Sequence, residues 1–475
     1  MMQDNSMTLI YEEICMKKIT RNLCFALASS FMLAGLIGCS SDSKDNSAML
    51  LMMQKPASSV PADQPATDNN DPKPTDAELS RCYIDNSAKK EITFVLSTEK
   101  WGITTELTNA HVRGSFNSWS DKDNYKLKKS ADGKFYYVTL PYADIKTLGN
   151  SGHPEYKFNT DGTDNGYLLA NDKTFIPEPY CFHTSDENLI IIFEGEDIED
   201  IKNCSDIAGT WKTLSDWSLE TADDATKEKF ANFRPIPGTT CAYRSWHPFK
   251  TKYHKDDGKK YLRDTEPERV AMVTSLYQKY GIKTDICLSG DETESLSTYP
   301  LGSISGENYT ESVPEYYKAL VKAGNVCNVK YHDPKTDKDV IPEYKYIYQA
   351  DFNPTYLNGW LKDIAKFISD DSHPAPYNVH CRLGNDRTGY YCAILAGLCG
   401  ATWKQIAEDY QKSNNTFLGE YRDQRLLKMV FEKQFGVEDI SKVSNLKELM
   451  MDYYEKDGSI PTEDLTKMVE KLTKK

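Results

Sequence analysis

Short apolar runs separated by turn residues dominate the chain between about residues 80 and 200. Two of the separating turns, 131–133 and 160–162, carry an Asp-Gly pair that favours a tight reversal. Runs of this length and spacing are typical of an antiparallel β-sandwich, and we expect one over residues 80–200. The strands that the pattern predicts are 92–96, 111–114, 134–140, 155–158 and 189–193.

After about residue 205, segments with apolar residues at helical spacing alternate with short apolar runs. This alternation predicts an α/β domain over 205–436, with a central sheet flanked by helices, so the chain as a whole is multidomain. Residues 437–475 are charged and helical in pattern, and we expect a C-terminal helical extension there. The predicted helices are 268–280, 313–323, 357–368, 389–398, 403–412 and 423–434, and the predicted strands are 284–288 and 344–348.

The N-terminal region pairs a basic stretch, 16–21, with an apolar run, 23–37, that is too short to span a membrane. The run ends in Leu-Ile-Gly-Cys at Cys39, which resembles the signal peptide and lipobox of bacterial lipoproteins over residues 1–39. The resemblance implies acylation of Cys39 and a lipid anchor in a membrane of the cell envelope. The alternative is a buried N-terminal helix. Residues 40–79 are rich in Ser, Asp, Asn and Pro and are expected to form a disordered tether.

The net charge of the chain bears on which kinds of molecule it can bind. The 475 residues carry a formal net charge of −14, which argues against a nucleic-acid partner. The same charge gives no long-range attraction for phosphorylated polyanions, so any phosphate-binding site must depend on local groups.

One stretch, 377–389, has the pattern of a phosphate-binding loop. A β-prone run ends at His380, a loop with one glycine follows, and apolar residues at helical spacing begin at Gly389. Backbone N–H groups of such a loop can surround a tetrahedral oxyanion at the positive end of the helix. Arg387 would close the site with a bidentate guanidinium. The loop residues before it are Arg382, Leu383, Gly384, Asn385 and Asp386.

Cys381 lies at the base of this loop. The field that binds phosphate also favours a thiolate, which makes Cys381 the candidate nucleophile, with His380 beside it as thiolate support. Attack on a bound phosphate would give a phosphocysteine, and the Thr388 hydroxyl could assist the later departure of the thiolate. This chemistry needs no metal and no cofactor. The structural alternative, a buried Cys beside a helix, explains neither the glycine nor the two arginines of the loop.

The pattern His380-Cys381-x5-Arg387-Thr388-Gly389 resembles the signature of the protein tyrosine phosphatase superfamily, in particular the bacterial tyrosine/lipid phosphatases and the myotubularins. The resemblance covers about 225–435. It differs from the lipid-preferring members at Asn385, where they carry Lys, and at Ser289, where an Arg is common. Further motifs of that bacterial family are 232–234, 243–245, 281–288 and 409–414.

The resemblance also bears on the general acid that protonates the leaving oxygen. The chain has no Trp-Pro-Asp motif to supply the usual mobile acid. Asp386 stands inside the loop, where the resembled lipid phosphatases place theirs, and its proximity to phosphate follows from its position. Asp351, expected on a facing loop, is the alternative acid. A structural pair to a neighbouring Arg is the other role open to Asp386.

The predicted sandwich carries a second resemblance. The segment 114–119, which ends in Trp119, and the segment 156–162, which contains Lys157, look like parts of the glycogen-binding modules, which have an immunoglobulin-like fold of the early-set type. The resemblance implies that Trp119 stacks on sugar rings and Lys157 hydrogen-bonds them. The second aromatic platform of that family is missing, and Tyr167 is the nearest replacement. The alternative is a structural or docking sandwich.

The number and spacing of the cysteines do not determine which of them form disulfide bonds. Outside the cytoplasm, eight cysteines remain after Cys15, Cys24, Cys39 and Cys381 are set aside, and their connectivity cannot be deduced. Cys392 and Cys399 lie two turns apart on a predicted helix, and we expect buried thiols there rather than zinc ligands.

Together these patterns predict a cysteine-dependent phosphatase of the tyrosine-protein or dual-specificity type, acting on a phosphorylated protein or a small phosphoester. One alternative is a glucan or glycan phosphatase, because a sugar-binding module beside a phosphatase domain resembles the domain plan of laforin and the plant glucan phosphatases. Another alternative is an inositol-phosphate or phosphoinositide phosphatase. A non-enzyme alternative is a surface glycan-binding lipoprotein with an inactive phosphatase scaffold. Expected partners besides the substrate are a glycan, through the sandwich, and the membrane, through Cys39.

Overall fold

A computed structural model describes residues 71–170, 173–182, 188–196, 221–249, 260–289, 313–416 and 421–474. The chain divides into two units, 1–68 and 69–475, and the described residues all belong to the second. The expected signal peptide with Cys39, and most of the expected tether, lie outside the described residues. Among the helices of the described ranges, none is long and apolar enough to cross a membrane.

The N-terminal part of this unit consists of two four-stranded antiparallel sheets. Their facing side chains form one core, in which Phe94 of the first sheet packs edge-on against Tyr156 of the second with ring centroids 4.8 Å apart. The expected strand-rich sandwich is therefore present. The first sheet has the order β1 (Tyr83–Asn86), β2 (Glu91–Ser97), β5 (Phe135–Pro141), β4 (Lys128–Lys129), and the second β3 (His111–Gly114), β6 (Glu155–Asn159), β8 (Asn188–Ile190), β7 (Cys181–Phe182).

The end of the predicted tether is folded onto this sandwich. Helix α2 (Asp76–Arg81) starts with a capping box in which Thr75 and Glu78 exchange hydrogen bonds. Leu79 packs on Val95 and Tyr137, which face outward from the first sheet and need apolar cover. The expectation that the tether runs to Leu79 is wrong for these residues, because the sheet has a second apolar face that the alternation of β2 alone did not reveal.

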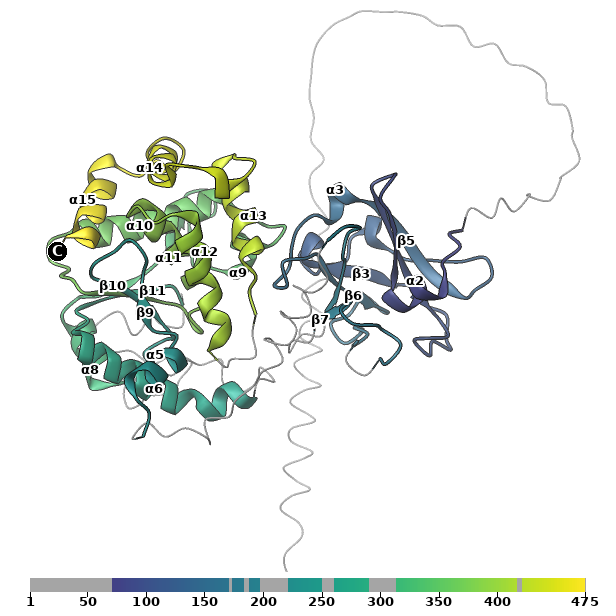
Figure 1. The fold of residues 1–475 in the computed structure, drawn as a ribbon, viewed down its shortest axis with the longest axis horizontal. Helices are drawn as coiled ribbons and strands as arrows, with labels where there is room; N and C mark the ends of the chain where they lie inside the picture. The colour runs from purple at the N-terminus through teal and green to yellow at the C-terminus, as the bar shows by residue number, and fades with distance from the viewer. Residues whose placement is uncertain are drawn as a thin grey trace, which may run out of the picture. The chain divides into compact units, whose positions relative to one another are not determined.

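The C-terminal part is built on a five-stranded sheet with helices on both faces (Figure 1). Its order is β12 (Val326–Asn328), β11 (Thr284–Cys287), β15 (Tyr377–His380), β10 (Ala242–Ser245), β9 (Arg234–Pro235), and all neighbours except β9 run parallel. Helices α5 (Asp224–Phe230), α6 (Lys260–Tyr280) and α8 (Glu315–Lys322) cover one face. The other face is covered by α9 (Tyr344–Tyr348), α10 (Pro354–Ser369), α11 (Asp386–Leu398), α12 (Trp403–Lys412), α13 (Gln424–Phe435), α14 (Leu446–Lys456) and α15 (Thr462–Thr473).

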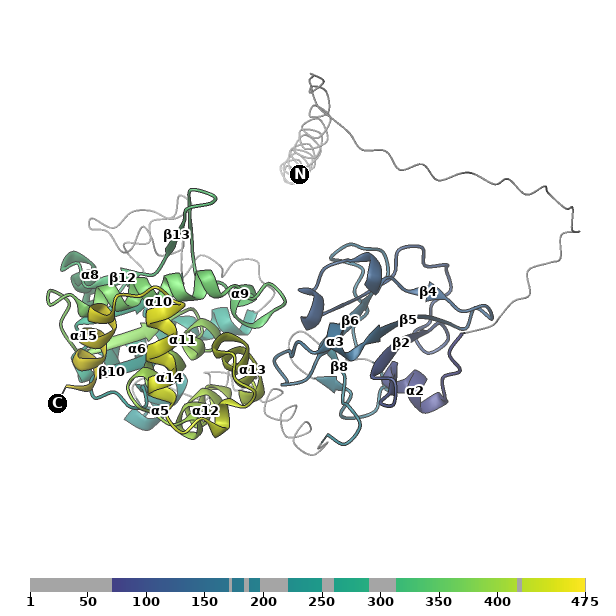
Figure 2. The same ribbon diagram turned by 90° about the horizontal axis from the view of Figure 1, so that it is seen from above.

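Smaller elements complete the unit. The hairpin of β13 (Tyr331–Asp333) and β14 (Lys338–Val340) projects from the helix-covered sheet (Figure 2). The remaining short helices are α3 (Tyr142–Ile145) and the 3₁₀ turns η1 (Ser115–Asn117), η2 (Asp123–Tyr125), η6 (Ser413–Asn415) and η7 (Ile440–Lys442).

The prediction of a strand at 344–348 is wrong, because this segment is helix α9. Its aromatic and β-branched residues favour a strand when read locally. In the fold, however, Tyr344 and Tyr348 lie one helical turn apart with their ring centroids at 5.2 Å, and Ile347 and Tyr348 are both buried in the core. Neighbouring residues that must both face one core suit a helix better than a strand.

The predicted C-terminal extension, 437–475, is helical as expected and packs into the same core as the sheet. Met450 of α14 and Leu465, Met468 and Leu472 of α15 are fully buried in that core. These helices therefore complete the apolar layer over α10 and α11 rather than standing apart from it.

Candidate active site

The predicted loop lies at the carboxyl end of β15, the central strand of the five. Every residue of β15 is buried, because it has a parallel neighbour on each side and helices on both faces. Cys381 follows the strand directly and is 3 % exposed, and α11 begins five residues later at Asp386. The carboxyl edge of a parallel sheet is where such folds hold their ligands, and the helix N-terminus favours an anion there.

The backbone of the loop requires its glycine. Gly384 has a φ of +74°, and a Cβ at this position would lie 2.6 Å from the Ser245 carbonyl oxygen. The Asn232 side-chain amide donates hydrogen bonds to the carbonyls of Leu383 (3.2 Å) and Gly384 (3.1 Å). Since the C=O and N–H of one peptide point in opposite directions, holding the carbonyls outward turns the following N–H groups toward the inside of the loop.

Four of the motif residues build the support beneath this loop. Asp409 of α12 accepts a hydrogen bond from Arg234 Nε at 2.6 Å and another from Arg244 Nη1 at 2.7 Å. Arg244 Nη2 then donates to the Gly384 carbonyl at 2.7 Å, and both arginines donate to the Ser413 hydroxyl. The arginines lower the pKa of the buried Asp409 below its ordinary value although burial alone would raise it. The motifs 232–234, 243–245 and 409–414 are thus one network under the loop.

The thiol of Cys381 is shifted toward its ionised form. Burial by itself raises the pKa of the thiol, but the Arg387 guanidinium and the hydroxyl and amide of Thr388 outweigh burial, and the pKa lies below its ordinary value. Cys392, on α11, has the opposite balance, and burial raises its pKa to about 12. The surroundings of Cys381 therefore favour a reactive thiolate, whereas those of Cys392 are typical of a buried structural thiol. The eight described cysteines are free thiols.

His380 does not point at the sulfur. Its Nε2 pairs with Asp285 Oδ2 at 2.8 Å and its Nδ1 lies 2.9 Å from the Cys381 carbonyl oxygen. Burial alone would lower the pKa of His380, but the Asp285 carboxylate raises it well above its ordinary value. Both ring nitrogens of His380 therefore have partners other than the sulfur, and one of these partners is the carbonyl of the residue that carries it.

Arg387 and Arg382 face a pocket of about 650 Å³ beside the loop. The Arg387 guanidinium donates through Nη1 to the carbonyls of Leu288 (2.9 Å) and Pro342 (3.3 Å), which fixes its direction. Lys345 and Asp386 also line this pocket. Lys345 is paired with Glu343 at 2.9 Å, so Arg382 and Arg387 are the cations of the loop that favour an anion at this opening, in a protein whose net charge is negative.

Comparison with known proteins was consistent with this geometry. A model described as the tyrosine phosphatase family matches residues 228–469, about half of the chain. The chain belongs to the tyrosine phosphatase family. A search of curated proteins found no match. The family match contains the loop, the network beneath it, helix α14 and the first part of α15, and it excludes the sandwich.

In this member of the family the two candidate acids are in different surroundings. Asp386 lines the pocket beside the loop, and both of its carboxylate oxygens accept hydrogen bonds from Arg422, from Nε and from Nη2 (3.2 Å). Asp351 is exposed in the turn after α9 and is not among the residues of that pocket. Arg422 had no signal in the sequence, because it lies 36 residues from its partner.

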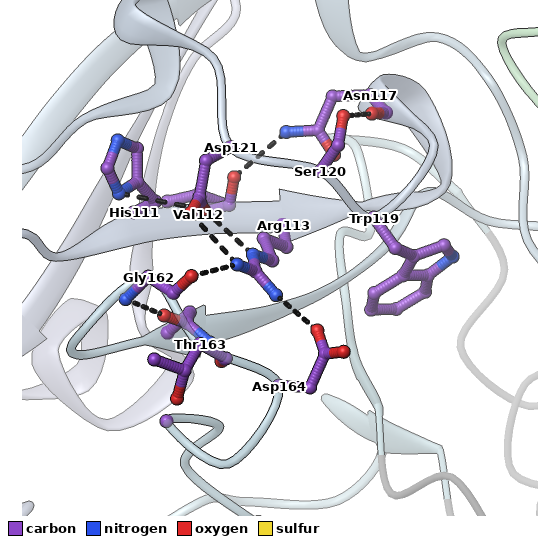
Figure 3. Close-up of polar contacts among 12 residues, drawn as sticks. His111, Val112, Arg113, Asn117, Trp119, Ser120, Asp121, Gly162, Thr163 and Asp164 are labelled. Carbon is purple, nitrogen blue, oxygen red and sulfur yellow. Dashed lines mark hydrogen bonds and ion pairs between the residues drawn. The ribbon is translucent and has the colours of Figure 1, made fainter. Parts of the chain in front are cut away.

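The three residues expected to bind sugar are brought together on the sandwich of the phosphatase. Lys157 Nζ lies 5.9 Å from the Trp119 ring centroid and 5.4 Å from that of Tyr167, and all three side chains are half-buried. Sequence reasoning missed Arg113, the buried cation that orders them (Figure 3). An arginine within the predicted strand 111–114 is the sequence signal that could have found it.

Arg113 ties together the two loops that carry the aromatic residues. It donates to the Asp121 carboxylate from Nε (2.7 Å) and Nη2 (2.9 Å), on the loop of Trp119. It also donates to the Gly162 carbonyl (2.9 Å) and the Tyr167 hydroxyl (3.1 Å), on the other loop. Figure 3 shows the bonds from the guanidinium to Asp121, Gly162 and Asp164, with the Trp119 indole beside them. The aromatic pair is therefore positioned before any ligand arrives.

Proposed function

We propose that the protein is a cysteine-dependent phosphatase that hydrolyses phosphomonoesters through a phosphocysteine intermediate. The observation that carries the proposal is the Cys381 thiol, whose pKa is lowered, at the base of a loop with cationic side chains around its opening. An inactive scaffold would have no need of a thiol whose pKa is lowered. For this reason we favour the enzyme hypothesis over the alternative of a glycan-binding lipoprotein with an inactive phosphatase scaffold.

The reaction has two displacements at phosphorus. In the first, the Cys381 thiolate attacks the phosphate held by the loop N–H groups and Arg387, the S–P bond forms and the P–O bond to the alcohol breaks. The departing oxygen takes a proton from the general acid. In the second, a water attacks the phosphocysteine, the conjugate base of that acid takes its proton, and the thiolate leaves with assistance from the Thr388 hydroxyl.

We favour Asp386 as the general acid, because it lines the pocket that the phosphate would enter and Asp351 does not. Asp386 can donate a proton only after Arg422 releases it, since the guanidinium now engages both carboxylate oxygens. We therefore propose that, when substrate binds, the Asp386 carboxyl group leaves Arg422 and contacts the leaving-group oxygen instead.

For the natural substrate, a phosphotyrosine protein or a small phosphoester is our first proposal, and a glycan, inositol-phosphate or phosphoinositide phosphatase is the second. We also propose that the protein is anchored to the cell envelope through acylated Cys39. The sandwich, with Trp119, Lys157 and Tyr167, is proposed to bind a glycan.

The decisive experiment replaces the nucleophile. Cys381→Ser should abolish release of phosphate from p-nitrophenyl phosphate while keeping the affinity for vanadate or phosphate, because the loop survives and the thiolate is lost. Arg387→Lys should lower kcat/KM by about a hundredfold or more, since a single ammonium cannot reproduce the two-pronged contact. Turnover by Cys381→Ser at a rate near that of the wild type would refute the thiolate mechanism.

A further inference from the structure

A second pocket, of about 350 Å³, joins the candidate acid to the aromatic pair of the sandwich. Its lining includes Asp386 and Arg422 on the phosphatase side, and Trp119, Lys157 and Tyr167 on the sandwich side. Asp386 also lines the phosphate pocket, as do Tyr344 and Gln349, so the two pockets are neighbours across three shared residues. A substrate with its phosphate at Cys381 would direct its alcohol group into this second pocket.

Hydrogen bonds connect the walls of the pocket within this compact unit. Tyr344 donates its hydroxyl to Asn150 Oδ1 at 2.7 Å, and the Asp423 amide donates to the Asn150 carbonyl at 2.8 Å. Arg425 reaches the Ser151 carbonyl at 3.4 Å, and the Ser151 amide donates to Glu155 Oε1 at 2.6 Å. These bonds join the loop before β6 to helix α9 and to the start of α13.

The floor of the pocket is polar although it is buried. Glu155 is 2 % exposed and Asn188 is 4 % exposed, and the Asn188 amide donates to Glu155 Oε2 at 2.7 Å. The other polar atom of that amide, Asn188 Oδ1, is buried and has no hydrogen-bond partner among the residues that the structure describes. A buried acceptor without a donor is costly, and a hydrogen bond from a ligand hydroxyl would relieve that cost.

The upper wall is aromatic and cationic. Trp119 and Tyr167 offer ring faces beside the Lys157 ammonium, and Arg113 fixes the two loops that present them (Figure 3). Trp119 also has a φ of +56°, a conformation that bulky residues adopt only where the surrounding structure imposes it. Ring faces above a floor of acceptors match a flat ring that bears several hydroxyls.

We propose that this pocket binds the sugar ring of a phosphorylated carbohydrate, so that the sandwich forms part of the active site and selects the alcohol half of the substrate. The proposal rests on the phosphatase function proposed above. A phosphotyrosine ring could stack on Trp119, but it brings no free hydroxyl for Asn188 and Glu155. A sugar ring supplies both the stacking face and the donors.

The test measures kcat/KM for glucose 6-phosphate and for p-nitrophenyl phosphate with the full-length protein, and takes their ratio. Trp119→Ala, Lys157→Gln and Asn188→Ala should each lower this ratio at least tenfold, because the sugar loses its stacking face or a polar partner. Trp119→Phe, which keeps a ring face, should recover part of the loss. Two controls are matched: Lys128→Gln removes a lysine that lies 4.5 Å from the Tyr137 ring outside the pocket, and Leu169→Ala removes an exposed apolar side chain of the sandwich.

The outcomes separate the two proposals. An unchanged ratio in the three pocket variants, or a ratio that falls as much in the two controls, would overturn the sugar site. A wild-type protein that hydrolyses p-nitrophenyl phosphate or a phosphotyrosine peptide but not glucose 6-phosphate would overturn the sugar site alone, and one that hydrolyses none of them would overturn the phosphatase function. Calorimetry of glucose 6-phosphate with Cys381→Ser, with and without Trp119→Ala, reports on binding where no turnover occurs, and equal affinities would again count against the site.

Discussion

Asp386 and Arg422 show how a single contact sets the role of a side chain. Asp386 has the position of a general acid, yet its carboxylate is held by the Arg422 guanidinium. The pair is partly exposed, with side-chain exposures of 21 % and 11 %, so it is not sealed in the way that His380 and Asp285 are. Because most of this pair is buried, a bound phosphoester displaces it only by supplying new contacts in its place.

Replacing the two candidate acids separates their roles. Asp386→Asn should lower kcat on an alkyl phosphate by about 10²–10⁴-fold, because an alkoxide leaves only with a proton. The same variant should lose much less on p-nitrophenyl phosphate, since p-nitrophenolate leaves without one. Asp351→Asn serves as the matched control and should remain near wild type on both substrates. Equal losses on the two substrates would assign Asp386 a structural role.

At the scale of elements, the strand, loop and helix from β15 to α11 depend on groups from other elements. Strand β9 supplies Arg234, β10 supplies Arg244, α12 supplies Asp409, and together they hold the Gly384 carbonyl. A buried charge network of this kind is costly to break, because removing one member leaves the others unpaired in a low dielectric. The conformation of the candidate active-site loop thus depends on how these three separate elements pack together.

Asp409→Asn should therefore destabilise the fold by about 3–5 kcal/mol in chemical denaturation and also lower kcat, because two buried guanidiniums lose their counter-ion. The matched control is Asp339→Asn, which breaks an exposed pair with Lys330 (2.7 Å) and should cost less than about 1 kcal/mol. Since the folded-state pKa of Asp409 is lowered, its stabilisation is complete above the ordinary pKa and is lost as pH falls through the lower folded value. A variant whose acid sensitivity matches that of the wild type would contradict this account.

At the scale of the whole described unit, the last two helices belong to the core of the phosphatase region. Helix α15 places Leu465, Met468 and Leu472 against the layer that also contains α10 and α11, and each of the three is fully buried. Helix α11 starts at the active-site loop, so the apolar cover over its far end helps to hold the N-terminal end that faces the ligand.

Leu465→Ala should lower the free energy of unfolding by about 2–5 kcal/mol, because it leaves a cavity in this layer. Leu169→Ala, at a leucine that is 53 % exposed, should change stability by less than about 0.5 kcal/mol. Denaturant midpoints at constant m-value measure both effects. A small effect at Leu465 would indicate that α15 is a dispensable extension, as its charged sequence pattern suggested.

The sequence by itself determined the features whose cause is local. Strand alternation predicted β2, β3, β5 and β6, helical spacing predicted α10 to α13, and the spacing from Cys381 to Thr388 predicted a strand-loop-helix site. In each case the neighbours that matter lie within a few residues, so the period of the pattern carries the information.

Only the tertiary structure decided features that depend on distant partners. It made 344–348 a helix, paired Asp386 with Arg422, turned His380 to Asp285, folded α15 into the core and placed Arg113 between two loops. None of these partners lies within one turn or one hairpin of the residue it controls. Burial and charge pairing between segments far apart in the chain overrode local propensity at these points, because an unpaired buried charge or an uncovered apolar face is more costly than a disfavoured local conformation.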